Sequence, residues 1–327
     1  MTEARRALVT GAAGFIGAHC VRFLAGRNWR VRALDVHPAP NDFKSLDVEF
    51  AQADLRDSSA LTASLQGVDV VFHLASVHLD VGASYAEFEA VNVRAVAALV
   101  AACAAAKVGR LVHVSSVGVY GHVEHPPADE SAPLHPENDY ERTKRAGEDA
   151  AREAAKQYGV DLVVVRPSWV YGVGCPRTEK LIGALRRGRF FYIGAARNLR
   201  HPVFISDFLE GMWLAATASE PLAGATFNIA GPRWMTVQEM VTTFATAINA
   251  RPPTLRIPRS VGYAAGWLAE LVGAVLKINP PISRRTLAFF ENDNAFDISA
   301  ARTRLKYEPR IELLDGVRSV LQASSAH

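Results

Sequence analysis

Two side chains that could transfer a proton, Tyr140 and Lys144, lie four residues apart in the segment YERTK. If this segment is helical, the spacing places both side chains on one face. A phenol ordinarily ionises near pH ~10, which is too high for an efficient base at neutral pH. A neighbouring ammonium group favours the phenolate and so lowers the pKa of the phenol. The pair predicts a general base in which Tyr140 takes the proton of a hydroxyl group and Lys144 assists it.

A glycine-rich turn near the start of the chain could hold a dinucleotide. In the segment VTGAAGFIG, Gly11, Gly14 and Gly17 have the spacing GxxGxxG between a predicted strand and a predicted helix. Such glycines allow a tight turn, a close approach of the backbone to a pyrophosphate, and close packing of helix against strand. Phe15 and Ile16 begin the helix, whose N-terminus would face the phosphates. The segment therefore predicts a dinucleotide-binding loop.

Two acidic residues at strand ends could bind the rest of the dinucleotide. Asp35 ends the predicted second strand, where a carboxylate can accept hydrogen bonds from both ribose hydroxyls. Because it would repel a 2′-phosphate, NAD is favoured over NADP; the alternative is a turn residue at the strand end. Asp54 and Leu55 follow the third strand, where a side chain could reach the adenine amine. A helix N-cap is the alternative role for Asp54.

The order of the predicted elements indicates the fold class. Short strands rich in Val and Leu alternate with alanine-rich helices, which is typical of parallel βαβ units. We expect an α/β protein with a Rossmann, doubly wound parallel sheet. The expected strands are 6–10, 29–35, 48–53, 68–74, 111–115 and 162–165, and the longest expected helices are 87–106 and 140–158.

The composition of the chain changes after Arg166, where Pro, Gly and aromatic residues become frequent and the regular alternation fades. This change predicts two parts. Residues 1–166 form the NAD-binding domain, to which a segment near 203–231 returns. Residues 167–327 form mainly a smaller substrate-binding lobe, whose loops close over the reactive end of the cofactor.

A series of motifs in chain order identifies a family resemblance. They are VTGAAGFIG at 9–17, DL at 54–55, HLA at 73–75, VNV at 91–93, VSSVGVYG at 114–121, YERTK at 140–144 and RPSWVYG at 166–172. Over nearly its whole length the chain resembles the extended short-chain dehydrogenase/reductase family, within the NAD-dependent epimerase/dehydratase superfamily. The resemblance implies a Rossmann domain, a C-terminal substrate lobe and a homodimer formed through the helices near 92–106 and 140–158.

The resemblance also implies roles for single residues. Ser116 matches the family's catalytic hydroxyl, with Ser115 as its competitor, and Tyr140 and Lys144 match the base and its helper. Lys144 would also bind the nicotinamide ribose. The remaining positions implied at the cofactor are Leu74 and Ala75 in the HLA turn, Asn92 as a structural asparagine, and Pro167 beside the nicotinamide.

Departures from the family's subgroups narrow the chemistry. The sugar-nucleotide dehydratases place an Asp-Glu pair directly after the catalytic hydroxyl, where this chain has Val117 and Gly118. Elimination of water needs an acid and a base, so dehydratase activity is disfavoured. The epimerases usually carry Asn at the position of Trp169, which predicts an apolar pocket wall here. Arg200, however, matches an arginine that binds the diphosphate in those enzymes.

A basic stretch gives a second indication about the substrate. Between residues 176 and 205 the acid Glu179 stands against seven basic residues. An anionic substrate and a solvated basic helix, with cations at its C-terminal end, explain this stretch equally well. The basic residues are Arg177, Lys180, Arg186, Arg187, Arg189, Arg197 and Arg200.

The C-terminal third resembles the 3β-hydroxysteroid dehydrogenase and dihydroflavonol reductase branches, in which an apolar stretch helps enclose hydrophobic rings. The corresponding stretch, 261–278, has almost the length of a membrane span but contains Glu270 and three glycines. We expect a buried or cleft-lining helix, with a helix lying on a membrane surface as the alternative. The aromatic residues that could line an apolar pocket are Phe190, Phe191, Trp234, Tyr263 and Trp267.

Composition excludes several other classes of protein. A net charge of +3 without an arginine-rich arm argues against nucleic-acid binding. The widely spaced cysteines Cys20, Cys103 and Cys175 have no metal-ligand spacing, and neither do the histidines, so we expect no metal. Reduced thiols and the absence of an apolar segment before the first strand predict a cytoplasmic protein. No integral membrane span is expected.

Together these patterns predict an NAD-dependent oxidoreductase that transfers hydride between the nicotinamide and a secondary alcohol or ketone of a ring substrate. A nucleotide-sugar epimerase, in which NAD is reduced only transiently, is the alternative within the enzymes. A non-catalytic NAD-sensing protein is the alternative outside them, although such family members tend to lack the tyrosine or the lysine.

Overall fold

A seven-stranded parallel sheet forms the centre of the computed structural model, which describes residues 4–78, 84–276 and 284–325. The strand order β11-β6-β5-β4-β1-β2-β3 is that of a doubly wound Rossmann sheet, so the predicted fold class is confirmed. The strands are β1 (Arg6–Thr10), β2 (Arg30–Asp35), β3 (Glu49–Gln52), β4 (Val70–His73), β5 (Arg110–Val114), β6 (Leu162–Pro167) and β11 (Thr226–Ile229).

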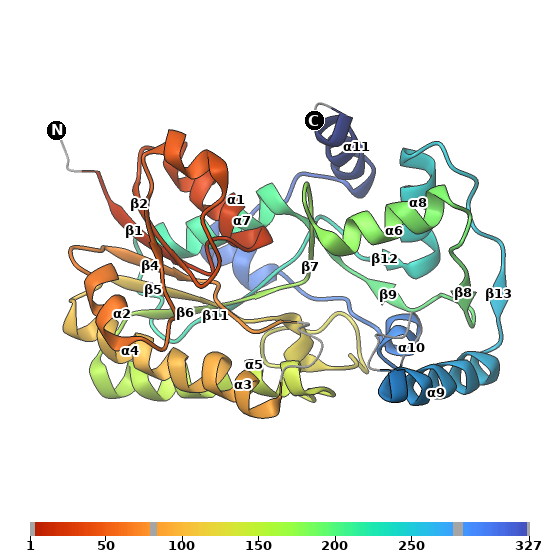
Figure 1. Cartoon of the computed structure of the whole chain (residues 1–327), viewed down its shortest axis with the longest axis horizontal. Coiled ribbons are helices and arrows are strands. Elements are labelled where there is room, and N and C mark those ends of the chain that lie inside the picture. Colours follow the sequence, from red (N-terminus) through yellow and green to blue (C-terminus); the bar gives the residue numbers. More distant parts are fainter. Residues whose placement is uncertain (1–3, 79–83, 277–283, 326–327) are drawn as a thin grey trace.

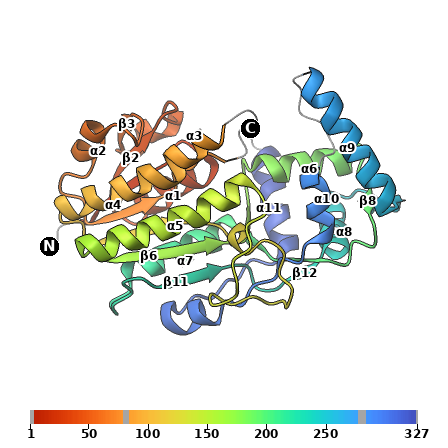
Figure 2. The ribbon, with the colours of Figure 1, turned by 90° about the horizontal axis from the view of Figure 1, so that it is seen from below.

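Helices cover both faces of this sheet (Figure 1). Side chains alternate between the faces along each strand; in β1, Ala7 and Val9 pack on one face and Leu8 on the other. The first face is covered by α1 (Phe15–Ala25) and α7 (Ile205–Thr217). The second is covered by α2 (Ser58–Ser64), α4 (Ala95–Ala105) and α5 (Asp139–Tyr158). Figure 2 shows α4 and α5 side by side along that face.

The order of the strands reverses between β1 and β4, which are neighbours in the sheet. The chain leaves β1 toward α1 on one face, and it leaves β4 toward α3 (Tyr85–Glu89) and α4 on the other. Ligands of open α/β sheets bind at this point, outside the carboxyl ends of the strands. The glycine-rich loop and the turn after His73 both start here.

The expected helix 87–106 is interrupted. A π-helical turn, Ala90–Arg94 (η2), separates α3 from α4 and carries the buried Asn92. Helix α5 crosses this turn at Gly147, where a Cβ would overlap the carbonyl oxygen of Asn92. Sequence periodicity does not predict such a turn, because it inserts one residue without changing the local composition.

The second lobe has a hydrophobic core of its own. Helices α6 (Pro176–Arg186), α8 (Val237–Ala247) and α11 (Leu313–Ser325) pack around residues such as Phe244, Tyr171 and Val317. Short paired strands connect them, while α7 and β11 return to the Rossmann sheet. The remaining elements are η1 (Asn41–Leu46), η3 (Val117–Tyr120), β7 (Trp169–Tyr171), β8 (Tyr192–Ile193), β9 (Leu199–Arg200), β10 (Pro202–Phe204), β12 (Met235–Thr236), β13 (Arg256–Ile257), α9 (Arg259–Leu276), α10 (Arg284–Glu291) and η4 (Ala301–Leu305).

Helix α9 packs on the lobe through its small residues. Gly262 and Gly266 are buried, and a Cβ at position 262 would press against Ile193 and Leu287. The large apolar side chains face outward: Trp267 is 65% exposed and Leu268 is 55% exposed. The expectation of a buried helix is therefore wrong for residues 261–269, whereas a role in lining a cleft remains a prediction, and residues 277–278 lie outside the described ones. Tyr263 is also exposed.

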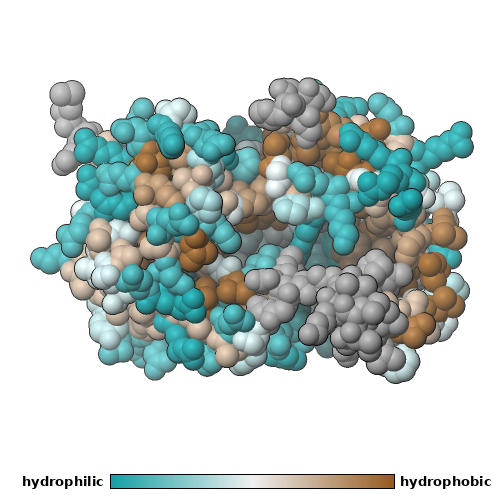
Figure 3. All heavy atoms as spheres, viewed as in Figure 1, coloured by the Kyte–Doolittle hydropathy of each residue, from teal (hydrophilic) through white to brown (hydrophobic). Residues whose placement is uncertain are grey.

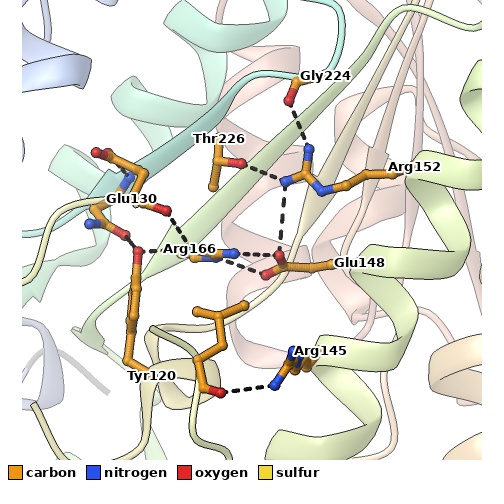
Figure 4. A network of polar contacts seen from close by, with 10 residues as sticks. Tyr120, Glu130, Arg145, Glu148, Arg152, Arg166, Gly224 and Thr226 are labelled. Atoms are coloured by element: carbon orange, nitrogen blue, oxygen red, sulfur yellow. Dashed lines mark hydrogen bonds and ion pairs between the residues drawn. The ribbon is translucent and has the colours of Figure 1, made fainter. Parts of the chain in front are cut away.

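A buried ion pair joins α5 to the sheet (Figure 4). Arg166 on β6 and Glu148 on α5 are 4% and 1% exposed, and they form two hydrogen bonds of 2.9 and 2.7 Å. The guanidinium also donates to the hydroxyl of Tyr120, which in turn donates to Asn228 on β11. The network thus fixes the catalytic helix, the loop after β5 and an outer strand relative to one another.

Replacing Arg166 by Met should lower the free energy of unfolding by about 3–5 kcal/mol, because the buried carboxylate of Glu148 loses both close hydrogen bonds and keeps only Arg152, whose Nη2 is 3.9 Å away. Denaturant-induced unfolding measures the loss. Arg142→Met on the same helix is the control, since Arg142 and Asp139 form an exposed pair worth about 0–1 kcal/mol. Equal losses in the two variants would contradict the assigned role of the buried pair.

Candidate active site

The glycine-rich loop and the turn after β4 lie in contact. Gly11 has φ +70°, and a Cβ there would lie 2.6 Å from the amide nitrogen of Ala75 and 2.8 Å from the carbonyl carbon of Leu74. A Cβ at Gly17 would overlap the carbonyl oxygen of Gly11. Both positions therefore need glycine, the first for its backbone conformation as well as for space. The geometry brings together two of the segments predicted to hold the cofactor.

The N-terminus of α1 is open to an anion. Gly14 is its N-cap and, within the described residues, no side chain caps the first-turn N–H groups, which include those of Phe15 and Ile16. Unpaired N–H groups at a helix N-terminus bind phosphate. Pro167, at the carboxyl end of β6, reaches the same edge of the sheet through the parallel pairing of the strands.

Asp35 connects the end of β2 to the glycine-rich loop. Its carboxylate accepts hydrogen bonds of 2.9 Å from the backbone N–H groups of Ala13 and His37, and the residue is 7% exposed. Both roles considered for Asp35 are compatible with this position, because it orders the strand end and stands beside the loop. Its role toward a ribose remains a prediction.

Asp54 forms an ion pair that the sequence did not indicate. The guanidinium of Arg56 donates to both its carboxylate oxygens and lowers the pKa of Asp54. The N-cap role considered for Asp54 is wrong, because Asp57 caps α2 by accepting from Ser59 and Ala60. Leu55 is buried. Contact of this segment with the adenine remains a prediction.

Ser116 is half-buried directly after β5. Its Oγ accepts a hydrogen bond of 3.0 Å from the backbone N–H of Gly118 and so caps η3. Because the oxygen is used as an acceptor, the hydroxyl hydrogen can be donated to a substrate oxygen. Ser115, its competitor, is 4% exposed, and its hydroxyl has no hydrogen-bond partner among the described residues. Exposure therefore favours Ser116 as the residue that meets a substrate.

Lys144 is buried beneath the ends of the central strands. It is 4% exposed and donates a hydrogen bond of 2.7 Å to the carbonyl of Val114. Burial lowers the pKa of Lys144 to about 8. Nearby, the imidazoles of His73 and His113 stack with their centres 5.2 Å apart, and burial together with the charge of Lys144 lowers both their pKa values. The base predicted at Tyr140 thus has a weakly solvated ammonium one helical turn away.

Tyr140 is half-buried in the first turn of α5, which Asn138 caps. The imidazole of His78 lies against its ring, with centres 4.4 Å apart and planes at 64°. Arg177, in the first turn of α6, approaches His78 with 3.4 Å between Nη2 and Nε2. The sequence did not assign His78 a role, and it named Arg177 only within a basic stretch, because no motif connects these residues.

Asn92 holds the loop after β4 against α5. Its side chain accepts from the backbone N–H of Val77 at 2.9 Å and donates to the carbonyl of Val77 at 3.2 Å. The amide also donates to Thr143, the neighbour of Lys144. The structural role implied for Asn92 therefore has a physical basis in these bonds, whereas its contact with a cofactor remains a prediction.

An acid lies near Ser116 although the sequence placed none there. Glu141 comes from α5: a Cβ at Gly118 would lie 3.4 Å from Glu141 Oε1 and 3.3 Å from Ser116 Oγ. The carboxylate accepts from the N–H of Glu137, and burial raises the pKa of Glu141. Because Gly118 has no side chain, the carboxyl group of Glu141 on α5 fits beside Ser116. In the sequence, the only indication that Glu141 lies near the site is its position directly after Tyr140.

The two substrate contacts predicted in the second lobe have other partners. Trp169 stacks on Phe244, with ring centres 6.1 Å apart, at the core of the lobe. Arg200 is 6% exposed and donates to the carbonyls of Leu199, Asn292 and Phe289. It therefore supports the C-terminal end of α10, and a diphosphate would have to displace these carbonyls.

The aromatic residues considered for an apolar pocket separate into two groups. Phe190 packs between Tyr192 and Phe290, and Phe191 also contacts the core of the lobe. Trp234 is 44% exposed beside His201, and the other two lie on the outer face of α9. Among the described residues, no group of His, Cys, Asp and Glu is arranged to hold a metal ion.

These features fit NAD. The glycines leave no room for side chains under the loop, the α1 N-terminus is uncapped within the described chain, and Asp35 stands beside it. When bound, NAD accepts or returns a hydride at its nicotinamide. Gly11, Gly14, Gly17 and Asp35 would hold its phosphates and ribose, while Lys144, Tyr140 and Ser116 would face the reacting end.

The fold and the site define a Rossmann oxidoreductase of the short-chain dehydrogenase type. Residues 7–230 match the NAD dependent epimerase/dehydratase family, and the chain belongs to that family. It is an NAD-dependent oxidoreductase or epimerase.

Two characterised relatives and a solved structure illustrate the family. The chain is 27% identical to 3beta-hydroxysteroid-dehydrogenase/decarboxylase isoform 1 of Arabidopsis thaliana, over 99% of this chain and 81% of that protein. It is 27% identical to 2-alkyl-3-oxoalkanoate reductase of Stenotrophomonas maltophilia, over 98% and 99%. The structure of MoeE5 with UDP-glucuronic acid and NAD is similar at a TM-score of 0.79, with 26% identity over 98% and 99% of the chains.

Replacing Asp35 by Ala should narrow the preference for NADH over NADPH by roughly tenfold, because the carboxylate that would repel a 2′-phosphate is removed. Fluorescence titration of the purified protein with each reduced dinucleotide measures the ratio of the two dissociation constants. Asp54→Asn is the control, since it should change both constants alike. An unchanged ratio in the Asp35 variant would show that Asp35 serves only the turn.

Proposed function

We propose that this protein transfers a hydride between NAD and a secondary alcohol or ketone of an apolar, ring-bearing substrate. The observation that carries the proposal is the position of Lys144, whose ammonium bonds the last carbonyl of β5, two residues before Ser116, and which lies one turn after Tyr140 on α5. The relatives support the same chemistry by name, since one is a hydroxysteroid dehydrogenase and the other reduces a 3-oxoalkanoate.

In this proposal each residue has one task. Ser116 donates its hydroxyl hydrogen to the substrate oxygen and so orients the substrate. Tyr140 takes the proton of the alcohol during oxidation and returns it during reduction. Lys144 favours the phenolate through its positive charge, and its burial strengthens that effect because water does not screen the ammonium.

A nucleotide-sugar epimerase is the second candidate. Structures similar to this chain include MoeE5 with UDP-glucuronic acid. However, Arg200, which matches the diphosphate-binding arginine of the epimerases, is bonded to backbone carbonyls, and Trp169, which replaces their usual Asn, packs on Phe244. An NAD-sensing protein is the candidate from another class, and the presence of the complete set of Ser116, Tyr140 and Lys144 argues against it.

Purified protein supplied with NAD and a 3β-hydroxysteroid should accumulate NADH, because the ketone leaves and the hydride stays on the cofactor. Tyr140→Phe should lower kcat by about 10²–10⁴-fold, as expected for loss of a general base. The absorbance of NADH measures both. The control is that Tyr140→Phe still binds NADH as tightly as the wild type. Interconversion of UDP-sugars without net NADH would instead establish the epimerase.

We further infer a homodimer formed through α4 and α5. The segment Tyr85–Ala105 has the length and apolar composition of a membrane span, and its most apolar stretch is 39% buried. Core helices of soluble proteins can have the same length and composition. The two helices lie side by side on one face (Figure 2), and a second copy would cover the exposed alanines.

The other partners that we propose are small-molecule substrates, and we expect no binding of nucleic acid. We also propose a cytoplasmic location, because the buried and free cysteines fit a reducing compartment.

The outer face of α9 is proposed to rest on a membrane surface. Its exposed large side chains are apolar, and exposed arginines flank them at Arg251, Arg256 and Arg259, without an acidic residue between positions 251 and 269. Figure 3 shows apolar surface at the right-hand edge, where Figure 1 places β13 and the adjoining end of α9. Apolar residues flanked by cations are typical of helices that lie on anionic lipid surfaces.

The wild type should co-sediment with vesicles that contain phosphatidylglycerol and only weakly with vesicles of phosphatidylcholine alone. The double variant Trp267→Ala, Leu268→Glu should bind the anionic vesicles at least roughly fivefold more weakly, because it loses apolar burial. Trp234→Ala, which removes an exposed tryptophan elsewhere, is the matched control. Binding that survives the double variant would exclude α9 as the contact.

A further inference from the structure

Glu141 is an acid at the active site to which hydride transfer gives no task. It is half-buried in the first turn of α5, directly after Tyr140. Its Oε2 accepts a hydrogen bond of 2.8 Å from the backbone N–H of Glu137. Its Oε1 lies 3.4 Å from the point where a Cβ of Gly118 would stand, and Ser116 Oγ lies 3.3 Å from the same point. The acid and the catalytic hydroxyl therefore border one small space.

No cation neutralises this carboxyl group. Among the described residues, no lysine or arginine forms an ion pair with Glu141, whereas Glu148 on the same helix is paired with Arg166. Burial raises the pKa of Glu141, so its carboxylate is a stronger base than an exposed one. Because the side chain is only half-buried, water can exchange the proton that it takes up. These properties suit a group that transfers protons.

The hydroxyl groups of Ser116 and Tyr140 determine what such a base can act on. Oxidation of the alcohol yields a ketone whose oxygen these two hydroxyls hold. Donors on a carbonyl oxygen stabilise the enolate and so make the C–H bonds of the neighbouring carbons more acidic. A carboxylate beside a carbonyl group held in this way is an arrangement that enzymes use to remove such a proton. The neighbouring carbon is two bonds from the oxygen, so it can enter the space that Glu141 borders.

We propose that Glu141 is a second proton-transfer residue, which exchanges a proton on the carbon next to the carbonyl group of the ketone. The inference rests on the proposed function, which supplies that ketone. The carboxylate of Glu141 removes the proton and becomes a carboxylic acid. The electron pair of the C–H bond forms a C=C bond, and the C=O pair moves to the oxygen, where Ser116 and Tyr140 donate to the enolate. Return of a proton from Glu141 restores the ketone, and no oxidant or reductant is consumed.

The test is the exchange of hydrogen for deuterium in 5α-androstan-3-one, incubated in D2O with the enzyme and NAD. Because oxidised NAD cannot reduce the ketone, the mass of the recovered ketone reports proton removal alone. The wild type should exchange at least about 100-fold faster than buffer. Glu141→Gln should return the rate close to that of buffer, because its amide keeps the shape and an acceptor for Glu137 but is not a base. In this variant, NADH formation from the matching 3β-alcohol should fall by less than about tenfold.

Glu137→Gln removes an exposed acid four residues earlier and is the matched control, which should leave both rates unchanged. Exchange in the wild type that is no faster than in buffer overturns the inference, as does exchange that persists in Glu141→Gln. Equal losses of exchange and of NADH formation in that variant also overturn it, because they indicate a structural role. Exchange that depends on Glu141 in a protein that forms no NADH would support the inference and count against hydride transfer alone.

Discussion

Arg166 and Glu148 are both almost completely buried, and each charge is compensated mainly by the other, with Arg152 at 3.9 Å from the carboxylate as a weaker neighbour. Their pairing fixes the rotation and depth of α5 against β6, and Lys144 lies one turn before Glu148 on the same helix. The other end of the network, through Tyr120, reaches the loop that begins with Ser116. The hydroxyl, the base and the ammonium come from two separate elements, so their common position depends on this buried pair.

Local sequence predicts those parts of the site in which the residues themselves determine the geometry. Gly17 is required by close backbone contact within one strand–turn–helix unit, Gly11 also by its positive φ, and Tyr140 and Lys144 are brought together by the period of one helix. The parallel sheet and the family follow from the same units. The partners of Asp54 and Arg200 were harder to predict. They are Arg56 and the carbonyls around α10, and residue spacing did not distinguish them from other possible partners.

The groups that sequence reasoning missed all reach the site from elements distant in the chain. Glu141 becomes a neighbour of Ser116 because Gly118 has no side chain, and His78 becomes a neighbour of Tyr140 because Asn92 holds the loop. Helix α9 was misjudged for a related reason. Its glycines are part of the apolar pattern, yet they form the face that packs, which leaves the large side chains outside.

The π-helical turn at Asn92 gives the segment from Tyr85 to Ala105 two helical registers, one before and one after the inserted residue. Each residue of an α-helix advances the side-chain direction by about 100°. Loss of one residue between 90 and 94 would therefore rotate either α3 or α4 by that angle. If α4 kept its packing of Val96, Leu99 and Cys103, Asn92 would turn away from Val77. A deletion in this segment would therefore change the direction in which its side chains point. The π-helical turn directs the amide of Asn92 toward Val77, in the loop beside Tyr140.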